Sequence, residues 1–193
     1  MPYKTNLDIA LVAPSGTGKS TINKAIISLL GNSVVKNSIS AATREPRPGE
    51  KDRKDYFFIE EEAFFEFAKA REFMEYNLYG STYYGTFRYV VQNIIKTGRS
   101  VVYDVDINGA VNLRNLDPRV KIFGIRAGLE TIEERLVKRG TETPQQIKRR
   151  MDIAEQELKR FAEVDFIIDY EKGAIADVAA NEIVNLWQKI QTP

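Results

Sequence analysis

The chain has 193 residues, which favours one domain with a substantial core. Its 28 Lys and Arg residues nearly balance 27 Asp and Glu residues, and a net charge of +1 does not indicate nucleic acid or a membrane as partner. It has no cysteine and no histidine, which excludes disulfides, thiolate metal sites and imidazole chemistry. Asp8 interrupts the first apolar run, and no stretch has the ~18 apolar residues of a membrane span, so we expect a cytoplasmic protein without a signal peptide.

The segment 13–21 joins an apolar run to a stretch with helical spacing of apolar residues. A strand, a glycine-bearing loop, Lys-Ser-Thr and a helix together predict a phosphate-binding loop, the P-loop. Gly16 and Gly18 let backbone N–H groups surround an anion, and the helix N-terminus adds partial positive charge. Lys19 can reach the outer phosphates, and the Ser20 hydroxyl can hold Mg²⁺. The predicted loop residues are Ala13, which replaces the usual first glycine, and Pro14, Ser15, Gly16, Thr17, Gly18, Lys19, Ser20 and Thr21.

Predicted strands and helices alternate along most of the chain, which favours a mainly parallel sheet covered by helices on both faces. Residues 40 to 86 break this alternation with strands in quick succession and a charged, proline-bearing surface loop from 41 to 55, and they are predicted to be an insert. Predicted strands are 7–12, 34–35, 38–40, 56–59, 73–78, 100–105, 121–125 and 166–168. Predicted helices are 19–30, 60–72, 88–97, 108–116, 129–139, 144–161 and 175–190.

Two of these helices carry further signals. Thr143 and Pro144 have the residue types expected at the cap and first position of a helix. In the closing helix, apolar residues at helical spacing predict one core-facing side made of Ile175, Val178, Ala179, Ile183, Leu186, Trp187 and Ile190.

Three charged residues outside the loop are candidates for the same site. Asp104 ends a predicted strand, where an acidic residue of P-loop proteins supports magnesium, although a carboxylate in an ordinary turn would look the same. Arg44 and Arg47 flank a proline in the charged loop. Their guanidinium groups match phosphate oxygens bidentately, but charged loop residues are usually only solvated. These residues alone do not establish a second binding site.

Further motifs, in order along the chain, resemble the guanylate kinase family. The resemblance extends from about Ile9 to Trp187, so it covers nearly the whole sequence. The motifs are Ser-Ala-Ala-Thr-Arg-Glu-Pro-Arg-Pro-Gly-Glu at 40–50, Asp-Tyr-Phe-Phe at 55–58, Glu-Phe-Met-Glu-Tyr at 72–76, Tyr-Tyr-Gly-Thr at 83–86, Asp-Val-Asp-Ile-Asn-Gly at 104–109, Arg-Leu-Val-Lys-Arg-Gly-Thr-Glu at 135–142 and Lys-Arg-Arg-Met at 148–151.

This resemblance implies a P-loop nucleoside monophosphate kinase of the α/β class. Such a kinase has a mainly parallel sheet, an inserted GMP-binding subdomain and a helical lid. The single domain would divide into a core of about 1–39, 90–128 and 161–193, an insert of about 40–89 and a lid of about 129–160. The implied activity is Mg-dependent transfer of the ATP γ-phosphoryl group to GMP, and also to dGMP, in purine nucleotide metabolism. ATP and GMP are the implied partners, and the oligomeric state is left open.

The resemblance also implies roles for individual residues. Guanine has N–H groups that can donate hydrogen bonds to carboxylates and an oxygen that can accept one from a hydroxyl. Adenine lacks this donor pattern and would leave buried carboxylates unpaired. Arg44, Arg47, Tyr56 and Tyr84 would hold the GMP phosphate, and Ser40, Glu75, Thr86 and Asp106 would read guanine. Lys19, Arg47, Arg139 and Arg150 would be catalytic, Arg135 would contact the ATP adenine, Ser20 would bind Mg²⁺, and Asp104 would support it through water.

Some positions depart from the family pattern, and other functions are possible. Alanine at position 13 also occurs in family members, and Ala42 stands where many members have Thr. Asp169-Tyr170 replaces the frequent Asn-Asp near the adenine, so the preference for the nucleotide donor is the least determined property. One alternative is a P-loop kinase for another phosphorylated acceptor, such as a ribose bisphosphate. Another is a non-catalytic protein-binding module. The guanine-reading set argues against the first, and the intact loop without room for a second domain argues against the second.

Overall fold

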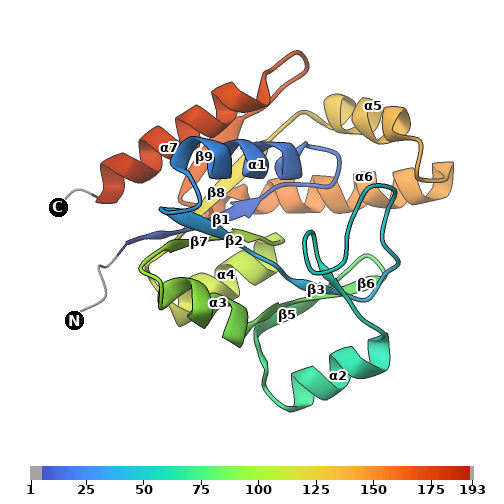
Figure 1. The fold of residues 1–193 in the computed structure, drawn as a ribbon. Helices are drawn as coiled ribbons and strands as arrows, with labels where there is room; N and C mark the ends of the chain where they lie inside the picture. Colours follow the sequence, from blue (N-terminus) through green and yellow to red (C-terminus); the bar gives the residue numbers. More distant parts are fainter. Residues whose placement is uncertain (1–5, 192–193) are drawn as a thin grey trace.

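The computed structural model describes residues 6–191. It has a central sheet with helices above and below, a smaller sheet on one side, and a pair of helices beyond the end of the central sheet (Figure 1). The predicted fold class is confirmed, since the larger sheet is parallel and covered on both faces. Among the described residues, no helix has the length and apolar character needed to span a membrane.

The central strand of the larger sheet is β1 (Asp8–Val12), which leads directly into the P-loop. It pairs with β7 (Ser100–Asp104) and β8 (Val120–Arg126), and the outer strands are β2 (Val35–Ser38) and β9 (Phe166–Asp169). All these pairings are parallel. Parallel pairing brings the carboxyl ends of the strands to one edge, where ligand sites of α/β proteins form.

Helices cover both faces of this sheet because alternate residues of β1 point to opposite sides. One face packs against α1 (Lys19–Leu30) and α7 (Ala176–Gln191), and the other packs against α3 (Arg88–Ile95) and α4 (Ile107–Leu116). Every residue of β1 is buried, as expected for a central strand covered on both sides.

The second sheet has the order β4-β3-β6-β5 and mixes parallel and antiparallel pairs. Strands β5 (Phe73–Tyr79) and β6 (Thr82–Phe87) form a hairpin, and α2 (Glu61–Lys69) packs against β5. The short strands β3 (Ala41–Ala42) and β4 (Phe57–Phe58) complete it. Strand β3 lies where we predicted only surface loop, and that prediction is wrong, because two alanines show no strand pattern and the pairing with β6 decides their conformation.

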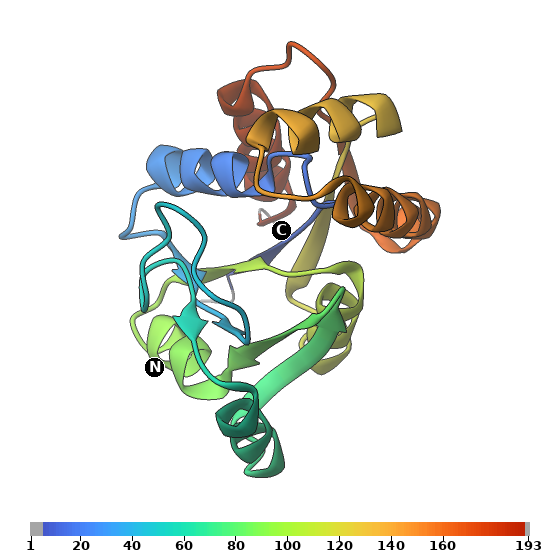
Figure 2. The same cartoon turned by 90° about the vertical axis from the view of Figure 1, so that its right-hand side faces the viewer.

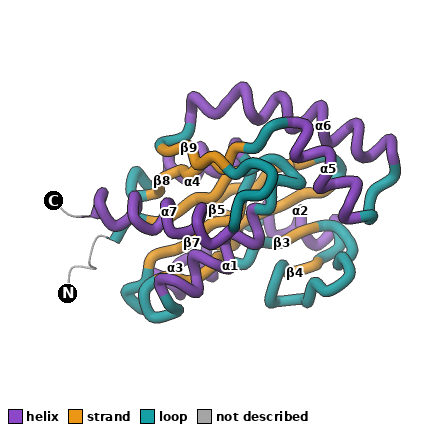
Figure 3. Tube along the Cα trace, turned by 90° about the horizontal axis from the view of Figure 1, so that it is seen from above, coloured by secondary structure: helices purple, strands orange, loops and turns teal. Residues whose placement is uncertain are grey.

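Helices α5 (Leu129–Arg139) and α6 (Pro144–Lys159) lie side by side (Figure 3). The start of α6 is confirmed: the Thr143 hydroxyl accepts from the Gln146 backbone N–H, and the Gln146 side chain accepts from the Thr143 N–H. A short 3₁₀ helix, Arg160–Glu163, continues α6. In a view turned by 90°, α5 and α6 lie on one side of the central sheet and the second sheet lies on the other (Figure 2).

The predicted core side of the closing helix is wrong at two positions. Ile175 and Val178 are 63% and 64% exposed. The helix begins at Ala176, so Ile175 precedes it, while Ala179, Ile183 and Trp187 carry the buried side. Apolar spacing predicted the helix, but it did not predict that the helix begins at Ala176 or that Val178 is exposed.

One acidic residue lies inside this core, at the start of β1. Asp8 is 3% exposed, and its carboxylate accepts from the backbone N–H of Val101 at 2.8 Å. Burial raises the pKa of Asp8 from 3.8 to about 6, and the hydrogen bond from Val101 only partly opposes this rise. Because the folded state holds this proton more tightly than the unfolded state, the residue's contribution to stability falls as pH rises from about 4 to 6.

We therefore expect Asp8→Asn to raise the free energy of unfolding at pH 7.5. The amide oxygen can still accept from Val101, while the charge is removed; a pKa rise of this size corresponds to about 3 kcal/mol as an upper value. Urea unfolding of both proteins from pH 4 to pH 8 measures the difference, which should be small at pH 4 and grow to a plateau above pH 6. A variant less stable than the parent at pH 7.5 would contradict the prediction.

Candidate active site

Most of the predicted site residues line a single cavity of about 590 Å³. It lies at the carboxyl edge of the parallel sheet, between the second sheet on one side and α5 and α6 on the other. The P-loop, the charged loop, both sheets and the helices α5 and α6 contribute to its wall. The predicted residues that line it are Ala13, Pro14, Ser15, Gly16, Gly18, Lys19, Ser20, Thr21, Ser40, Arg44, Arg47, Tyr56, Glu75, Tyr84, Asp104, Asp106, Arg135, Arg139 and Arg150.

The P-loop follows β1 and turns through two glycines with left-handed backbone. Gly16 has φ 93° and Gly18 has φ 102°, values that side chains strongly disfavour. A Cβ atom on Gly16 would also lie 2.9 Å from Cγ of Leu136 in α5. Thr17 is fully buried and does not line the cavity, although its backbone oxygen accepts from Arg135 at 2.5 Å. The loop conformation and the position of α5 therefore depend on each other.

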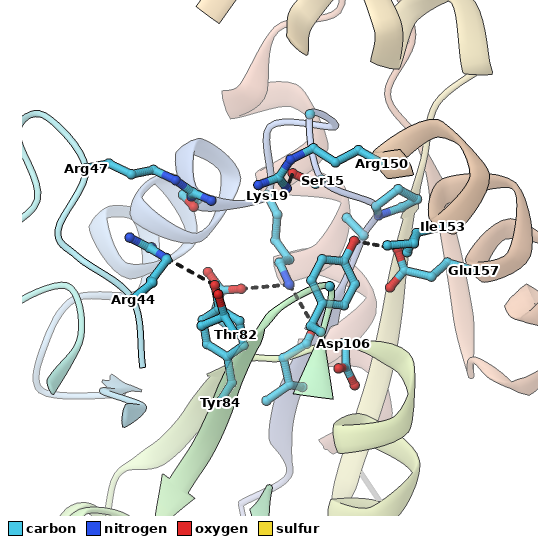
Figure 4. Close-up of a pocket in the computed structure, with 18 of the residues that line it drawn as sticks. Ser15, Lys19, Arg44, Arg47, Thr82, Tyr84, Asp106, Arg150, Ile153 and Glu157 are labelled. Carbon is cyan, nitrogen blue, oxygen red and sulfur yellow. Dashed lines mark hydrogen bonds and ion pairs between the residues drawn. The ribbon is translucent and has the colours of Figure 1, made fainter. Parts of the chain in front are cut away.

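Lys19 projects from the start of α1 into the middle of the cavity (Figure 4). Its ammonium group pairs with Asp104 at 2.8 Å and donates to the backbone oxygen of Val105 at 2.7 Å. Ser20 also lines the cavity, so a hydroxyl and a carboxylate, ligand types that suit Mg²⁺, lie near Lys19. Within 6–191 no group of three or more His, Cys, Asp or Glu side chains is arranged to hold a metal ion. Ser20 and Asp104 are thus the residues near Lys19 whose ligand types fit Mg²⁺.

Among the arginines that line the cavity, four are close enough to influence one another and form what we call the arginine cluster: Arg44, Arg47, Arg139 and Arg150. Arg44 forms a bidentate pair with Glu50, at 2.6 and 2.9 Å, and donates to the Tyr84 hydroxyl at 3.1 Å. Burial and the positive charges of the other three arginines lower the pKa of Arg47. This concentration of positive charge is suited to binding phosphate groups.

The arginines of the cluster come from two sides. Arg44 and Arg47 lie in the charged loop after β3, and Arg150 projects from α6 toward the P-loop, where it donates to the Ser15 hydroxyl at 2.6 Å (Figure 4). Arg135 lies outside the cluster: its guanidinium group sits 4.6 Å from the ring centre of Tyr170. The cluster therefore faces the phosphate end of the cavity, whereas Arg135 lies against the segment after β9.

Two carboxylates face the cavity from the opposite wall. Glu75 on β5 accepts from the Thr86 hydroxyl at 2.6 Å, and burial raises its pKa to about 7, with a smaller contribution from the negative charge of Asp106. Asp106 caps α4 through the Gly109 N–H and accepts from the Asn77 side chain at 2.7 Å. Thr86 is fully buried behind Glu75 and does not line the cavity, so in this structure it orients a carboxylate instead of facing a ligand.

Sequence reasoning missed several residues of the cavity wall. Asn77 and Tyr79 share one face of β5 with Glu75, so the alternation of strand residues could have found them. Glu157 on α6 is 5% exposed, accepts from the Tyr79 hydroxyl at 3.1 Å, and has a pKa raised to about 7 by burial. The sequence gives no such signal for Glu157, because charged residues surround it on a helix that looks solvated.

Of the departures from the family pattern, Ala13 lines the cavity, whereas Ala42 and the pair Asp169-Tyr170 lie outside it. Ala42 is fully buried within the second sheet and is not part of the wall. Asp169 forms a surface ion pair with Arg126 at 2.6 Å. Tyr170 supports Arg135, as described above. Neither departure removes a polar group from the wall of the cavity.

Comparisons with known proteins agree on one family. The sequence model described as guanylate kinase matches residues 6–181. A guanylate kinase of Maricaulis maris is 39% identical over 179 residues, which cover 92% of this chain and 81% of the relative. One of Clostridioides difficile is 37% identical, covering 87% of this chain and 82% of the relative. A crystal structure of guanylate kinase from Anaplasma phagocytophilum matches with a TM-score of 0.76 and 23% identity over 98% of this chain and 88% of that one, which supports the fold.

The matches cover the segments that form the cavity, from the P-loop through the second sheet to α5 and α6. The predicted family and enzyme class are thereby confirmed. The chain belongs to the guanylate kinase family and is a nucleoside monophosphate kinase, a phosphotransferase.

Proposed function

We propose that the protein transfers the γ-phosphoryl group of ATP to GMP in a Mg²⁺-dependent reaction that gives ADP and GDP, and that dGMP is a second acceptor. One observation carries the proposal: Glu75 and Asp106 line the same cavity as Lys19 of the P-loop. Two carboxylates suit the N–H donors of guanine, and a P-loop lysine suits a triphosphate. A role in purine nucleotide metabolism and a cytoplasmic location stay predictions of the same proposal.

The donor half of the site is the P-loop with its lysine. The loop N–H groups and Lys19 would bind the ATP phosphates, with Arg135 toward the adenine. Ser20 would hold Mg²⁺ directly and Asp104 through water, and the ion would supply positive charge between the phosphates. In the structure Asp104 pairs with Lys19 at 2.8 Å, and this ion pair keeps the ammonium group pointing into the cavity.

The acceptor half lies on the second sheet and the charged loop. Arg44, Arg47, Tyr56 and Tyr84 would hold the GMP phosphate. The guanine base would be read by Glu75 and Asp106, with Ser40 as a hydroxyl partner and Thr86 holding Glu75 in place, as its 2.6 Å hydrogen bond supports. Both recognition elements, base and phosphate, are also present in dGMP.

The chemistry needs no general base, because a phosphate acceptor is already ionised at neutral pH. This suits a chain without histidine. The barrier would be lowered by aligning the two nucleotides and by positive charge around the transferred group from Lys19, Arg47, Arg139 and Arg150. Because α5 and α6 carry Arg139 and Arg150, closure of these helices over the bound nucleotides would complete the site and exclude water.

The direct test compares acceptors with Mg-ATP: GMP, dGMP, AMP, UMP and ribose 5-phosphate. We expect turnover of GMP and dGMP. For Lys19→Ala we expect a rate that is lower by a factor of about a thousand or more, with an unchanged circular dichroism spectrum. Near-normal activity of that variant would contradict the mechanism. Faster turnover of a non-guanine acceptor would contradict the assignment of the substrate.

The pKa of Glu75 predicts a pH dependence of GMP binding. The ionised carboxylate accepts the guanine N–H groups, so the KM for GMP should fall about tenfold from pH 6 to pH 8 around a pKa of about 7. The GMP phosphate titrates near pH 6 as well. Glu157 has a pKa of about 7 and lines the same cavity. Glu75→Gln, in which the phosphate and Glu157 still titrate but position 75 does not, therefore serves as the reference profile. Identical profiles for the two proteins would contradict the assignment of Glu75.

Gly109 gives a second test of Glu75. A Cβ atom at Gly109 would lie 2.8 Å from Oε2 of Glu75. Alanine is favoured over glycine inside a helix such as α4, so Gly109→Ala should keep the melting temperature while displacing the carboxylate. We expect a KM for GMP about tenfold higher and a KM for ATP within twofold, measured by initial rates beside the exposed control Asn112→Ala on the same helix. An unchanged KM for GMP would contradict the role of Glu75.

A further inference from the structure

Glu142 is an acidic residue among the arginines that the proposed mechanism does not use. It lies in the loop between α5 and α6, and its side chain is only 5% exposed. Its carboxylate accepts from both Nε and Nη2 of Arg139, forms an ion pair with Nε of Arg150 at 3.4 Å, and accepts from the Thr141 hydroxyl at 2.7 Å. One carboxylate is thus shared by the two arginines that the lid contributes to the cluster.

The arginine cluster requires such a group because like charges repel. Arg139 and Arg150 lie close enough to Arg47 to lower its pKa, after burial and Arg44. On the side of the second sheet, Glu50 offsets the charge of Arg44 and accepts from the Arg47 backbone N–H at 2.8 Å. On the side of α5 and α6, Glu142 offsets the charges of Arg139 and Arg150 as Glu50 offsets that of Arg44. Burial opposes its ionisation, but the hydrogen bonds from Thr141 and Arg139 hold its pKa below the ordinary value, so it is charged at neutral pH.

The geometry of Arg150 shows what this contact does. Its Nε faces Glu142, while its Nη1 donates to the Ser15 hydroxyl of the P-loop at 2.6 Å. The carboxylate therefore holds the guanidinium group at Nε and leaves Nη1 turned toward the phosphate-binding loop. The position of Glu142 is itself fixed, because the next residue, Thr143, caps α6 through its reciprocal pair with Gln146.

We propose that Glu142 is a positioning residue for phosphoryl transfer: its carboxylate holds Arg139 and Arg150 together, against their mutual repulsion, so that both guanidinium groups face the P-loop. The inference rests on the roles proposed for these arginines. Glu142 acts through them and contacts no residue assigned to the acceptor, so it affects the rate of transfer and not the binding of GMP.

Kinetics of four proteins test this. The parent chain is compared with Glu142→Gln, which keeps the shape and removes the charge, with Glu142→Asp, which keeps the charge, and with the control Glu155→Gln, which breaks an exposed ion pair with Lys159 on the same helix. For Glu142→Gln we expect kcat about thirtyfold lower and a KM for GMP within twofold. Glu142→Asp should recover most of the loss, and Glu155→Gln should match the parent.

A second measurement does not depend on activity. The Nε–H of Arg139 donates to Glu142 at 3.3 Å, and Nε of Arg150 forms an ion pair with the same carboxylate at 3.4 Å. Nitrogen-15 NMR of the parent should show the Arg139 Nε–H signal protected from exchange with water. Glu142→Gln, but not Glu155→Gln, should remove this protection and shift the Nε signal of Arg150. This result is readable even when no acceptor is turned over.

The outcomes separate this inference from the proposed function. Failure of the parent protein to phosphorylate GMP with Mg-ATP would refute the proposed function, while the NMR signals would still decide whether Glu142 holds both arginines. A kcat for Glu142→Gln within threefold of the parent would overturn the inference. Equal losses of kcat in Glu142→Gln and Glu142→Asp would also overturn it. So would a loss of kcat that accompanies a fall in melting temperature while the Nε signals of the two arginines match those of the parent.

Discussion

Repulsion between like charges is the constraint on which this site depends. A kinase that joins two anionic nucleotides must gather cations in one cavity before either nucleotide is present. Here each group of cations has a carboxylate partner: Asp104 for Lys19, Glu50 for Arg44, and Glu142 for the two lid arginines. These ion pairs reduce the repulsion between neighbouring cations while the cavity holds no anion.

The fold brings these pairs together from separate parts of the chain. The parallel sheet supplies the P-loop and Asp104 at its carboxyl edge, and the second sheet supplies Glu75 and Tyr84. The charged loop supplies Arg44 and Arg47, and α5 and α6 supply Arg139 and Arg150. Contacts across the cavity join these parts in the structure. Arg150 reaches the P-loop at Ser15, and Tyr79 of the second sheet donates to Glu157 of α6.

Local signals predicted local structure well, and contacts between distant segments explain what was missed. The helix 19–30 and the helix 129–139 were predicted with their observed bounds, and the cap at Thr143 was correct, because glycines, caps and apolar spacing act over a few residues. Strand β3 was missed because β6, far along the chain, pairs with it. Most residues of the cavity came from motifs, whereas Glu157 looks like an ordinary solvated charge until the fold buries it.

The bidentate pair between Arg44 and Glu50 has a consequence for turnover. If Arg44 holds the acceptor phosphate as proposed, the product must leave this arginine after each reaction. Glu50 is attached six residues away on the same loop, so a replacement anion is always within reach and none has to arrive from solution. An internal carboxylate that competes for the arginine weakens product binding and so favours release, at the cost of a lower affinity for the incoming nucleotide.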